Sequence, residues 1–343
     1  MSPKSIFALT LIAIHFTISF AGCSTKPAPS AAEETKPQDI SVRLPIPAVR
    51  PSMGPFFAAQ EYGWYSKQGL KVSLNYGAES TNPVAMVLSG SDQIGVLGGP
   101  DTVLVAVGKG APLVIVAIMH KDSNMPCVIT KRDSGITNVA QLADKRVGMF
   151  KGHISTDVLR NWFRRTGVKV TEVDVGYDYS QFLNSQIDAQ WAFTTAAAVE
   201  LEEKGIPVNV LNPSVDGIYT HGFTIFTTKD FLAAHPDRVR GFLAATFEGI
   251  TKMHDSPDEI SKLVTSRDTT GNLQVDQVRR RIDQYNTFSP SFNPLPPGYF
   301  NKKMISDTYD RLLEEGVIEK PFPVENAYTT KFLAEIHGEK YTP

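Results

Sequence analysis

The chain has 343 residues, of which 42% are hydrophobic and 20% are charged, with 25 Gly, 23 Pro and 2 Cys. This composition excludes a collagen-like repeat, a disulfide-rich miniprotein and a disordered acidic tail. The 34 Lys and Arg residues nearly balance the 36 Asp and Glu residues, so the formal charge of -2 argues against a nucleic-acid partner held by bulk electrostatics. The length suggests about two domains, each with its own core.

The first 22 residues have the features of a signal peptide, because Lys4 precedes an apolar segment that ends in small residues before Cys23. This segment is shorter than the roughly 20 residues that a membrane-spanning helix needs. The sequence at 20–23 resembles a bacterial lipobox, which implies a diacylglycerol anchor on Cys23. An ordinary cleaved signal and an uncleaved anchor are the alternatives. Residues 23–40 are expected to form a flexible tether, since Ser24 to Asp39 includes no aromatic residue.

Cys127 is the second and last cysteine of the sequence. If Cys23 is lipidated, no disulfide can form within the chain and no metal site can be built on cysteine. Between Pro126 and Val128, Cys127 is expected to be a small buried hydrophobic residue rather than a nucleophile. We therefore expect neither a metal nor a cofactor.

Short apolar segments alternate with helical patterns in the first two thirds of the chain. Alternation or continuous apolar runs, typical of half-buried and fully buried strands, predict strands at Lys71–Tyr76, Ile94–Leu97, Leu113–Ile118, Val147–Phe150, Val170–Val175, Asp188–Phe193 and Val208–Leu211. Helix starts are expected at Asn82-Pro83, Asp101, Ser155 and Thr194 or Thr195. This alternation predicts a parallel-rich α/β sheet in each of two lobes.

From His235 onward the sequence is mainly helical. Apolar stripes at helical spacing occur in three segments, 239–250, 275–285 and 304–312, and a capping box with Pro at its first helical position stands at 256–259. A helical tail of this length without a sheet of its own must pack on an earlier lobe.

Several motifs occur in an order that is similar to one known family. They are Glu61–Leu70, Gly98–Leu104, Asp133–Ile136, Gln141–Gly148, Phe223–Lys229 and His235–Val239. Over about residues 41–335 the sequence resembles the periplasmic solute-binding proteins of nitrate/sulfonate/taurine-type ATP-binding-cassette (ABC) importers. Within that superfamily it is most similar to the branch that binds thiamine pyrimidine precursors and riboflavin.

The resemblance implies a type II periplasmic-binding-protein fold, with two α/β lobes, a ligand cleft between them and two strand crossovers at the hinge. We expect these crossovers near Cys127–Lys131 and His221–Phe226. Residues 41–129 and 225–343 would then form lobe 1, and residues 130–224 would form lobe 2. The resemblance also implies a monomer in the periplasm or on the outer face of the cell membrane, anchored through Cys23, that delivers a small-molecule solute to ABC permease and ATPase subunits.

Ligands of open parallel sheets lie beyond the carboxyl ends of the strands, where helices begin. The loops expected there contain the candidate ligand-binding residues Met53, Phe56, Ser80, Thr81, Gly99, Asp101, Thr102, Gly152, His153, Ser155, Thr156, Tyr179, Trp191, Phe193, Thr194, Tyr219 and His221. Aromatic rings together with the carboxylates of Asp101 and Asp216 favour a pyrimidine- or flavin-like heterocycle over a small oxyanion, which a nearby carboxylate repels. A site for sulfonate, nitrate or bicarbonate, and a ligand sensor with the same fold, are the alternatives.

Some of these residues have a second interpretation. Trp191 and Phe193 lie on one face of a strand, and that face is as often part of a core as of a ligand site. Asp101 can cap its helix, and His153 can be a solvated loop residue. These alternatives stay open at the level of the sequence.

Common catalytic motifs are missing from the sequence. It has no Gly-x-Ser-x-Gly elbow, His-Glu-x-x-His helix, phosphate-binding Gly-x-x-x-x-Gly-Lys loop or Gly-x-Gly-x-x-Gly turn. The same fold is also similar to a pyrimidine synthase that carries a cysteine-rich loop, and no residues here match that loop. We therefore expect a binding protein and not an enzyme, with a Ser-His-Asp triad from distant positions as the alternative left open.

Overall fold

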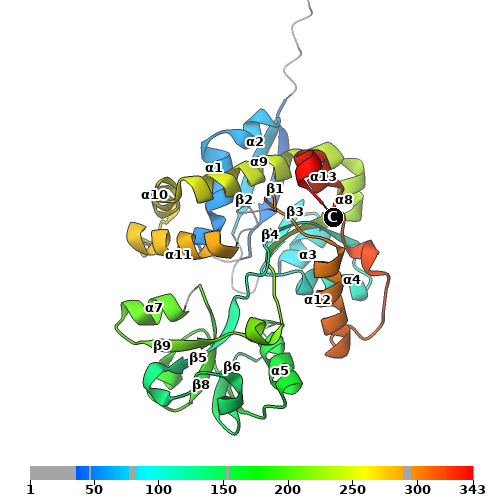
Figure 1. Ribbon diagram of the computed structural model, residues 1–343. Coiled ribbons are helices and arrows are strands. Elements are labelled where there is room, and N and C mark those ends of the chain that lie inside the picture. The colour runs from blue at the N-terminus through cyan, green and yellow to red at the C-terminus, as the bar shows by residue number, and fades with distance from the viewer. Residues whose placement is uncertain are drawn as a thin grey trace, which may run out of the picture. The chain divides into compact units, whose positions relative to one another are not determined.

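The computed structural model describes residues 36–45, 48–76, 82–151, 154–195, 197–288 and 295–342. Its helices surround two five-stranded sheets (Figure 1), sheet A with the strand order β2-β1-β3-β10-β4 and sheet B with the order β7-β6-β8-β5-β9. Each sheet has a separate hydrophobic core. We call the elements around sheet A lobe 1 and those around sheet B lobe 2. The predicted two-lobed α/β fold class is confirmed, whereas the expected signal peptide and Cys23 lie outside the described residues.

Sheet A is parallel except for one strand that comes from a part of the sequence beyond sheet B. Its strands are β1 (Gln38–Arg43), β2 (Leu70–Asn75), β3 (Ile94–Leu97), β4 (Leu113–His120) and β10 (Gly222–Thr228). Strand β10 runs antiparallel between β3 and β4, so that Thr224 lies opposite both Leu97 and Ile118. All residues of β4 are buried, as a continuous apolar run in a covered sheet predicts.

Strand β1 was not expected, and it begins inside the segment assigned to the tether. It pairs in parallel with β2 from Gln38 opposite Leu70 onward. Ile40, Val42 and Leu44 are buried while the residues between them are more exposed, which is the period of a half-buried strand. The expectation of a tether up to residue 40 is therefore wrong at its carboxyl end, which must lie before Gln38.

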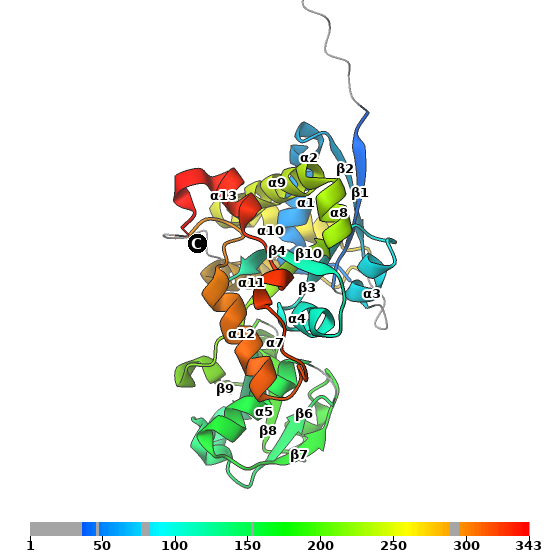
Figure 2. The ribbon, with the colours of Figure 1, turned by 90° about the vertical axis from the view of Figure 1, so that its right-hand side faces the viewer.

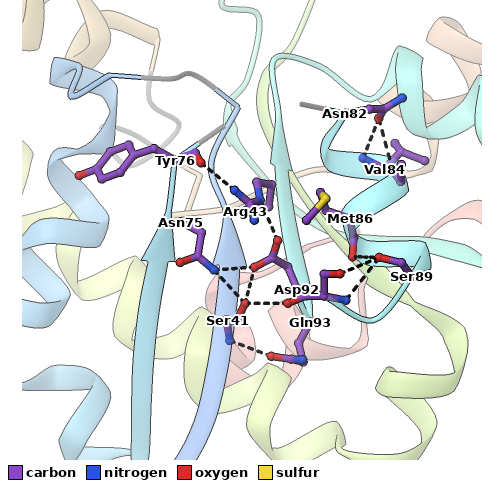
Figure 3. A network of polar contacts seen from close by, with 12 residues as sticks. Ser41, Arg43, Asn75, Tyr76, Asn82, Val84, Met86, Ser89, Asp92 and Gln93 are labelled. Carbon is purple, nitrogen blue, oxygen red and sulfur yellow. Dashed lines mark hydrogen bonds and ion pairs between the residues drawn. The ribbon is translucent and has the colours of Figure 1, made fainter. Parts of the chain in front are cut away.

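A polar network holds the amino end of β3 against β1 and β2 (Figure 3). The carboxylate of Asp92, whose side chain is inaccessible to solvent, accepts hydrogen bonds from Ser41 Oγ, from Asn75 Nδ2 at 2.7 Å and from Arg43 Nε at 2.7 Å. Arg43 also donates to the carbonyl of Tyr76 at 2.7 Å. Burial acts to raise the pKa of Asp92, but these hydrogen bonds and the guanidinium charge outweigh it and hold the pKa below its ordinary value.

The helices of lobe 1 come from both ends of the sequence, and the helical tail packs on this lobe as predicted. They are α1 (Gly54–Glu61), α2 (Trp64–Lys67), α3 (Pro83–Leu88), α4 (Asp101–Gly108), α8 (Lys229–Ala234), α9 (Pro236–Asp255), α10 (Pro257–Arg267), α11 (Val275–Phe288), α12 (Lys302–Glu314) and α13 (Lys331–His337). Helix α9 packs on α1 and α12 on α4. Gly249 of α9 permits the close approach to α1, since a Cβ there would overlap the carbonyl of Pro55.

Sheet B is formed by one continuous part of the sequence. Its strands are β5 (Pro126–Lys131), β6 (Arg146–Met149), β7 (Thr171–Asp174), β8 (Ala189–Phe193) and β9 (Val208–Leu211), and its helices are α5 (Ile154–Thr166), α6 (Ser180–Leu183) and α7 (Ala197–Glu203). Strands β6, β7 and β8 are parallel, and β5 runs antiparallel between β8 and β9. The apolar stripe of α5, which contains Trp162, is buried in this core.

Two segments, 121–125 and 212–221, join the sheets and hydrogen-bond to one another. The Asn124 amide donates to the Thr220 carbonyl at 3.2 Å, and the Thr220 amide donates to Asn124 Oδ1 at 3.0 Å. Both segments precede the crossovers expected near Cys127–Lys131 and His221–Phe226, because β5 and β10 each pair within a single sheet. Residues 126–129 therefore belong to sheet B, and residues 222–224 belong to sheet A.

Helices of the two lobes also meet away from the joining segments. On one side, Arg281 of α11 pairs with Glu200 of α7 at 2.8 Å, and Arg280 pairs with Glu203. On the other, the carboxyl end of α12 lies beside α5 (Figure 2), where Arg164 donates to the Glu314 carbonyl at 3.2 Å. None of the helices described here is both long and apolar enough to cross a bilayer.

Candidate functional site

The backbone is unusual where the lobes join. Asp122, Asn124 and Phe223 have φ angles of 48°, 44° and 52°, and they are three of the five non-glycine residues with positive φ in the described part of the chain. Left-handed backbone is unfavourable for residues with a side chain, above all for bulky ones, and such residues gather at functional sites. This concentration directs attention to the joining segments.

A group of four residues in lobe 1 borders these segments, and we call it the polar group: Gly99, Asp101, His221 and Arg311. The carboxylate of Asp101, at the start of α4, forms a buried ion pair with Arg311 of α12, and it makes no capping hydrogen bond. A Cβ on Gly99 would lie 2.9 Å from the carbonyl oxygen of His221 and 3.0 Å from Asp101 Oδ2. Glycine is therefore needed where β3, α4 and the second joining segment meet.

His221 connects the polar group to the first joining segment. Its Nδ1 accepts a hydrogen bond from the backbone amide of Asp122 at 3.1 Å, and the Asp122 carboxylate lies 3.5 Å from the same nitrogen. Burial lowers the pKa of His221, although the charges of Asp122 and Asp101 act to raise it. The imidazole is therefore neutral near pH 7, in agreement with its role as hydrogen-bond acceptor.

Four rings on β8 and after the carboxyl ends of β6 and β7 form the aromatic group of lobe 2: Phe150, Tyr177, Trp191 and Phe193. Trp191 packs against the other three, with ring-centre distances of 5.8 Å to Phe150, 5.7 Å to Tyr177 and 5.2 Å to Phe193. Only 2% of Trp191 is exposed, whereas 63% of Tyr177 is exposed. Tyr177 thus offers an accessible aromatic surface, and the buried ring of Trp191 packs against it.

Met125 links the aromatic group to lobe 1. Its carbonyl accepts a hydrogen bond from the Thr194 amide at 2.9 Å, next to Phe193. Its methyl carbon lies 2.9 Å from the position that a Cβ of Gly222 would occupy, and Gly222 is opposite His120 in sheet A. The aromatic group and the carboxyl end of β4 therefore flank the same residue. His120 was not among the predicted ligand-binding residues, because it follows an apolar run without interrupting it.

The remaining candidate residues are spread over several environments. Met53 and Phe56 are fully buried, and Phe56 packs on Phe242 with ring centres 6.3 Å apart, which places both in the core of lobe 1. Ser155 and Thr156 are buried at the start of α5, and Thr156 Oγ1 donates to the Phe150 carbonyl at 3.0 Å.

Four other candidates are partly or largely accessible. Thr102, Tyr179 and Thr194 are half-buried, and Tyr219 is exposed. Burial and the nearby Glu200 carboxylate raise the pKa of Tyr179. The candidates Ser80, Thr81, Gly152 and His153 lie outside the described residues.

Two surface depressions, of about 390 and 310 Å³, lie on lobe 1 away from the polar and aromatic groups. The first is lined by residues of α1, α2 and β2, and the second by residues of α8, α9 and α13. Neither contains a candidate residue. Within the described part of the chain, no three His, Cys, Asp or Glu side chains converge in a way that could hold a metal ion.

A family model described as NMT1/THI5 like matches residues 50–260, more than half of the chain. The chain belongs to the NMT1/THI5-like family. One relative, the 4-amino-5-hydroxymethyl-2-methylpyrimidine phosphate synthase of Schizosaccharomyces pombe, is 27% identical over 245 residues, which are 66% of this chain and 69% of the relative. The formylaminopyrimidine-binding protein of Halalkalibacterium halodurans is 22% identical over 230 residues, 65% of this chain and 69% of that protein.

A solved structure supports the fold of this NMT1/THI5-like protein. The periplasmic aliphatic sulphonate binding protein SsuA of Escherichia coli superposes with a TM-score of 0.68 at 16% identity, covering 84% of this chain and 91% of SsuA. At that identity the likeness concerns the fold alone. The fold that the resemblance to periplasmic solute-binding proteins implied is thereby confirmed.

Proposed function

We propose that this NMT1/THI5-like protein is the solute-binding lipoprotein of an ABC importer and that it holds one small organic molecule where its lobes join. One observation carries the proposal: the polar group of lobe 1 and the aromatic group of lobe 2 both border the two segments that connect the sheets. Joining segments that hydrogen-bond to each other suit a hinge, and groups on both sides of a hinge can enclose a ligand. The extracytoplasmic location and the lipid anchor on Cys23 belong to this proposal.

The ligand class follows from the exposed aromatic surface. Tyr177, with Phe150 and Phe193 beside it, presents ring faces and edges on which a flat heterocycle can stack. The carboxylate of Asp101 contributes less to ligand selectivity than the sequence suggested, because Arg311 neutralises its charge. The names of two relatives refer to pyrimidines, which supports the same class. A pyrimidine is therefore the first candidate ligand and a flavin the second.

Binding rather than synthesis is supported by the state of Cys127. The residue is fully buried, its thiol donates a hydrogen bond to the Ala192 carbonyl at 3.5 Å, and burial raises its pKa. A thiol in this environment is protonated and inaccessible, so it is a poor nucleophile and a poor metal ligand. A binding protein for sulfonate, nitrate or bicarbonate remains the second candidate function, favoured by the superposition with SsuA.

A thermal-shift panel on the chain without residues 1–22 tests the proposal. A ligand that binds only the folded state raises the apparent stability by RT ln(1 + [L]/Kd). We expect 4-amino-5-hydroxymethyl-2-methylpyrimidine to raise Tm, and riboflavin, ethanesulfonate, nitrate and bicarbonate to have less effect. If none of these compounds moves Tm, solute binding of this kind is refuted. If only ethanesulfonate, nitrate or bicarbonate raises Tm, the protein binds a small anion and not a heterocycle.

Tyr177→Ala sharpens this test because Tyr177 is exposed and its loss leaves the core intact. Removing one stacking ring should weaken pyrimidine binding by about 1 kcal/mol, roughly fivefold, in a calorimetric titration. Tyr62→Ala, which removes a tyrosine that packs on Trp64 in lobe 1, is the matched control and should leave the affinity unchanged. Equal affinities for both variants would remove Tyr177 from the site.

A further inference from the structure

His120 ends β4 and is buried, and none of the residues that the structure describes hydrogen-bonds to its side chain. Only 1% of the residue is exposed, and neither Nδ1 nor Nε2 has a partner among the described residues. Buried polar side chains are hydrogen-bonded in most proteins, because an unpaired group loses its hydration without compensation. The lack of a partner among the described residues therefore indicates that His120 has a role other than packing in the core.

Two aromatic rings contact the imidazole and fix its position. Tyr285 of α11 stacks on the ring at 5.3 Å with an interplanar angle of 28°, and Phe223 meets it edge-on at 5.1 Å and 89°. Phe223 also packs on Tyr285 at 6.2 Å. Phe223 is also one of the residues with a left-handed backbone, at a φ of 52°, a conformation that costs free energy for a bulky residue.

Two more unpaired polar atoms accompany these rings. Thr224 Oγ1, one residue after Phe223, and Asn286 Oδ1, one residue after Tyr285, are buried and have no partner in the described part of the chain. The charged side chains nearby are already paired, Lys121 with Asp122 at 2.8 Å and Arg311 with Asp101. The unpaired hydrogen-bonding capacity at this end of sheet A is therefore neutral.

The position of His120 connects it to the site described above. Lys121, the next residue, begins the first joining segment, and Gly222 opposite His120 touches Met125 beside the aromatic group. We propose that His120 is a ligand-binding residue, held in place by Tyr285 and Phe223, that hydrogen-bonds a neutral nitrogen heterocycle from lobe 1 while the aromatic group contacts it from lobe 2. This inference rests on the proposed function.

The chemistry of a buried imidazole selects the ligand. A neutral imidazole carries its proton on either nitrogen, so it can donate to a ring nitrogen or accept from an exocyclic amine. Burial lowers the pKa of His120 to about 3, so the ring brings no positive charge to the site at neutral pH. A sulfonate or nitrate would lose its hydration here without meeting a cation, whereas an aminopyrimidine offers both kinds of hydrogen-bonding atom.

Calorimetric titration of His120 variants tests this inference, with 4-amino-5-hydroxymethyl-2-methylpyrimidine and ethanesulfonate as probes and the chain without residues 1–22 as the protein. We expect His120→Phe to lose at least about tenfold in pyrimidine affinity, the consequence of leaving one ligand atom unpaired. His120→Gln, which keeps a donor and an acceptor, should lose less. His254→Phe, on the half-exposed end of α9, is the matched control and should bind like the wild type.

The melting temperature of the ligand-free variants separates a binding role from a structural one. His120→Phe keeps an aromatic ring between Tyr285 and Phe223 and removes two unpaired nitrogens, so its Tm should equal or exceed that of the wild type. A clear fall in Tm would assign the imidazole to the fold and overturn the inference.

The binding outcomes distinguish the inference from the function on which it rests. Pyrimidine binding that is equal in wild type and His120→Phe overturns the inference and leaves the proposed function standing. If the wild type binds ethanesulfonate and not the pyrimidine, the role of His120 and the heterocyclic ligand class are both refuted. The protein would still be a solute-binding protein. If the wild type binds neither probe, the inference fails together with the pyrimidine assignment, and the wider panel decides the function.

Discussion

Asp92 and His120 are buried polar side chains at opposite ends of sheet A that differ in their hydrogen bonding. At the amino end of β3, Asp92 accepts hydrogen bonds from three side chains and faces a guanidinium (Figure 3). At the carboxyl end of β4, His120 has none among the described residues. A fully satisfied buried group stabilises a fold, whereas an unsatisfied one costs free energy that the fold alone does not recover. The hydrogen bonds of Asp92 therefore stabilise the fold, whereas the imidazole of His120 adds no such stabilisation within the described residues.

The largest effect expected from this comparison concerns Asp92→Ala. It leaves Arg43 only partly accessible and without its carboxylate, and removing one partner of a buried pair costs about 3 kcal/mol of unfolding free energy. Urea denaturation followed by circular dichroism measures the loss. Asp39→Ala is the control, because Asp39 pairs with Lys71 at 3.8 Å between the neighbouring strands but is largely exposed, and it should cost less than about 0.5 kcal/mol. Similar losses in both variants would contradict a structural role of the network.

A smaller effect is expected from acidification. The pKa of Asp92 in the folded state lies below its ordinary value of 3.8, so its contribution to stability is present above that value and disappears as the pH falls through the folded-state pKa. Wild type should therefore lose more unfolding free energy than Asp92→Asn between pH 6 and pH 2. Denaturant midpoints across this range give the comparison. Parallel pH profiles would show that Asp92 is not held as a carboxylate.

The smallest effect belongs to the contact between α11, which carries Tyr285, and lobe 2. Arg281→Ala removes the ion pair with Glu200, whose side chain is 38% exposed, and should change the unfolding free energy by less than about 0.5 kcal/mol. The ring contact between Tyr285 and His120 does not depend on this pair. Thermal unfolding of Arg281→Ala and of Arg280→Ala checks the expectation, and a loss above about 1 kcal/mol in either would mean that the lobes stabilise one another.

Much of the fold follows from local patterns in the sequence. The predicted strands at Ile94–Leu97 and Val208–Leu211 have the observed bounds, since short apolar runs between turn residues leave little choice. Strands β5 and β10 were interpreted as crossovers because a short apolar strand does not reveal which sheet it joins. Strand β1 was missed because its alternating residues follow directly on a segment rich in Pro, Ala and Glu.

The site was harder to predict, because its contacts join residues far apart in the sequence. The sequence suggested Gly99, Asp101 and His221 separately, and the structure brings them together. It also pairs Asp101 with Arg311, a partner 210 positions away that no local pattern indicates. The available signal for His120 was a single polar residue at the carboxyl end of the run Leu113–Met119, directly before Lys121 and Asp122.

The insertion of β10 into sheet A after sheet B has been passed in the sequence has a consequence for synthesis of the chain. Sheet B uses only residues 126–211, so all its strands have left the ribosome once that stretch has been made. Sheet A, although it begins first, lacks its inner strand until Gly222–Thr228 emerges, and β4 has no neighbour before then. Domains generally fold as units in the order of their translation. Sheet B, although its first strand is made after those of sheet A, is therefore the first sheet that can be completed. Strand β4, which ends at His120, has no neighbouring strand until β10 has been made.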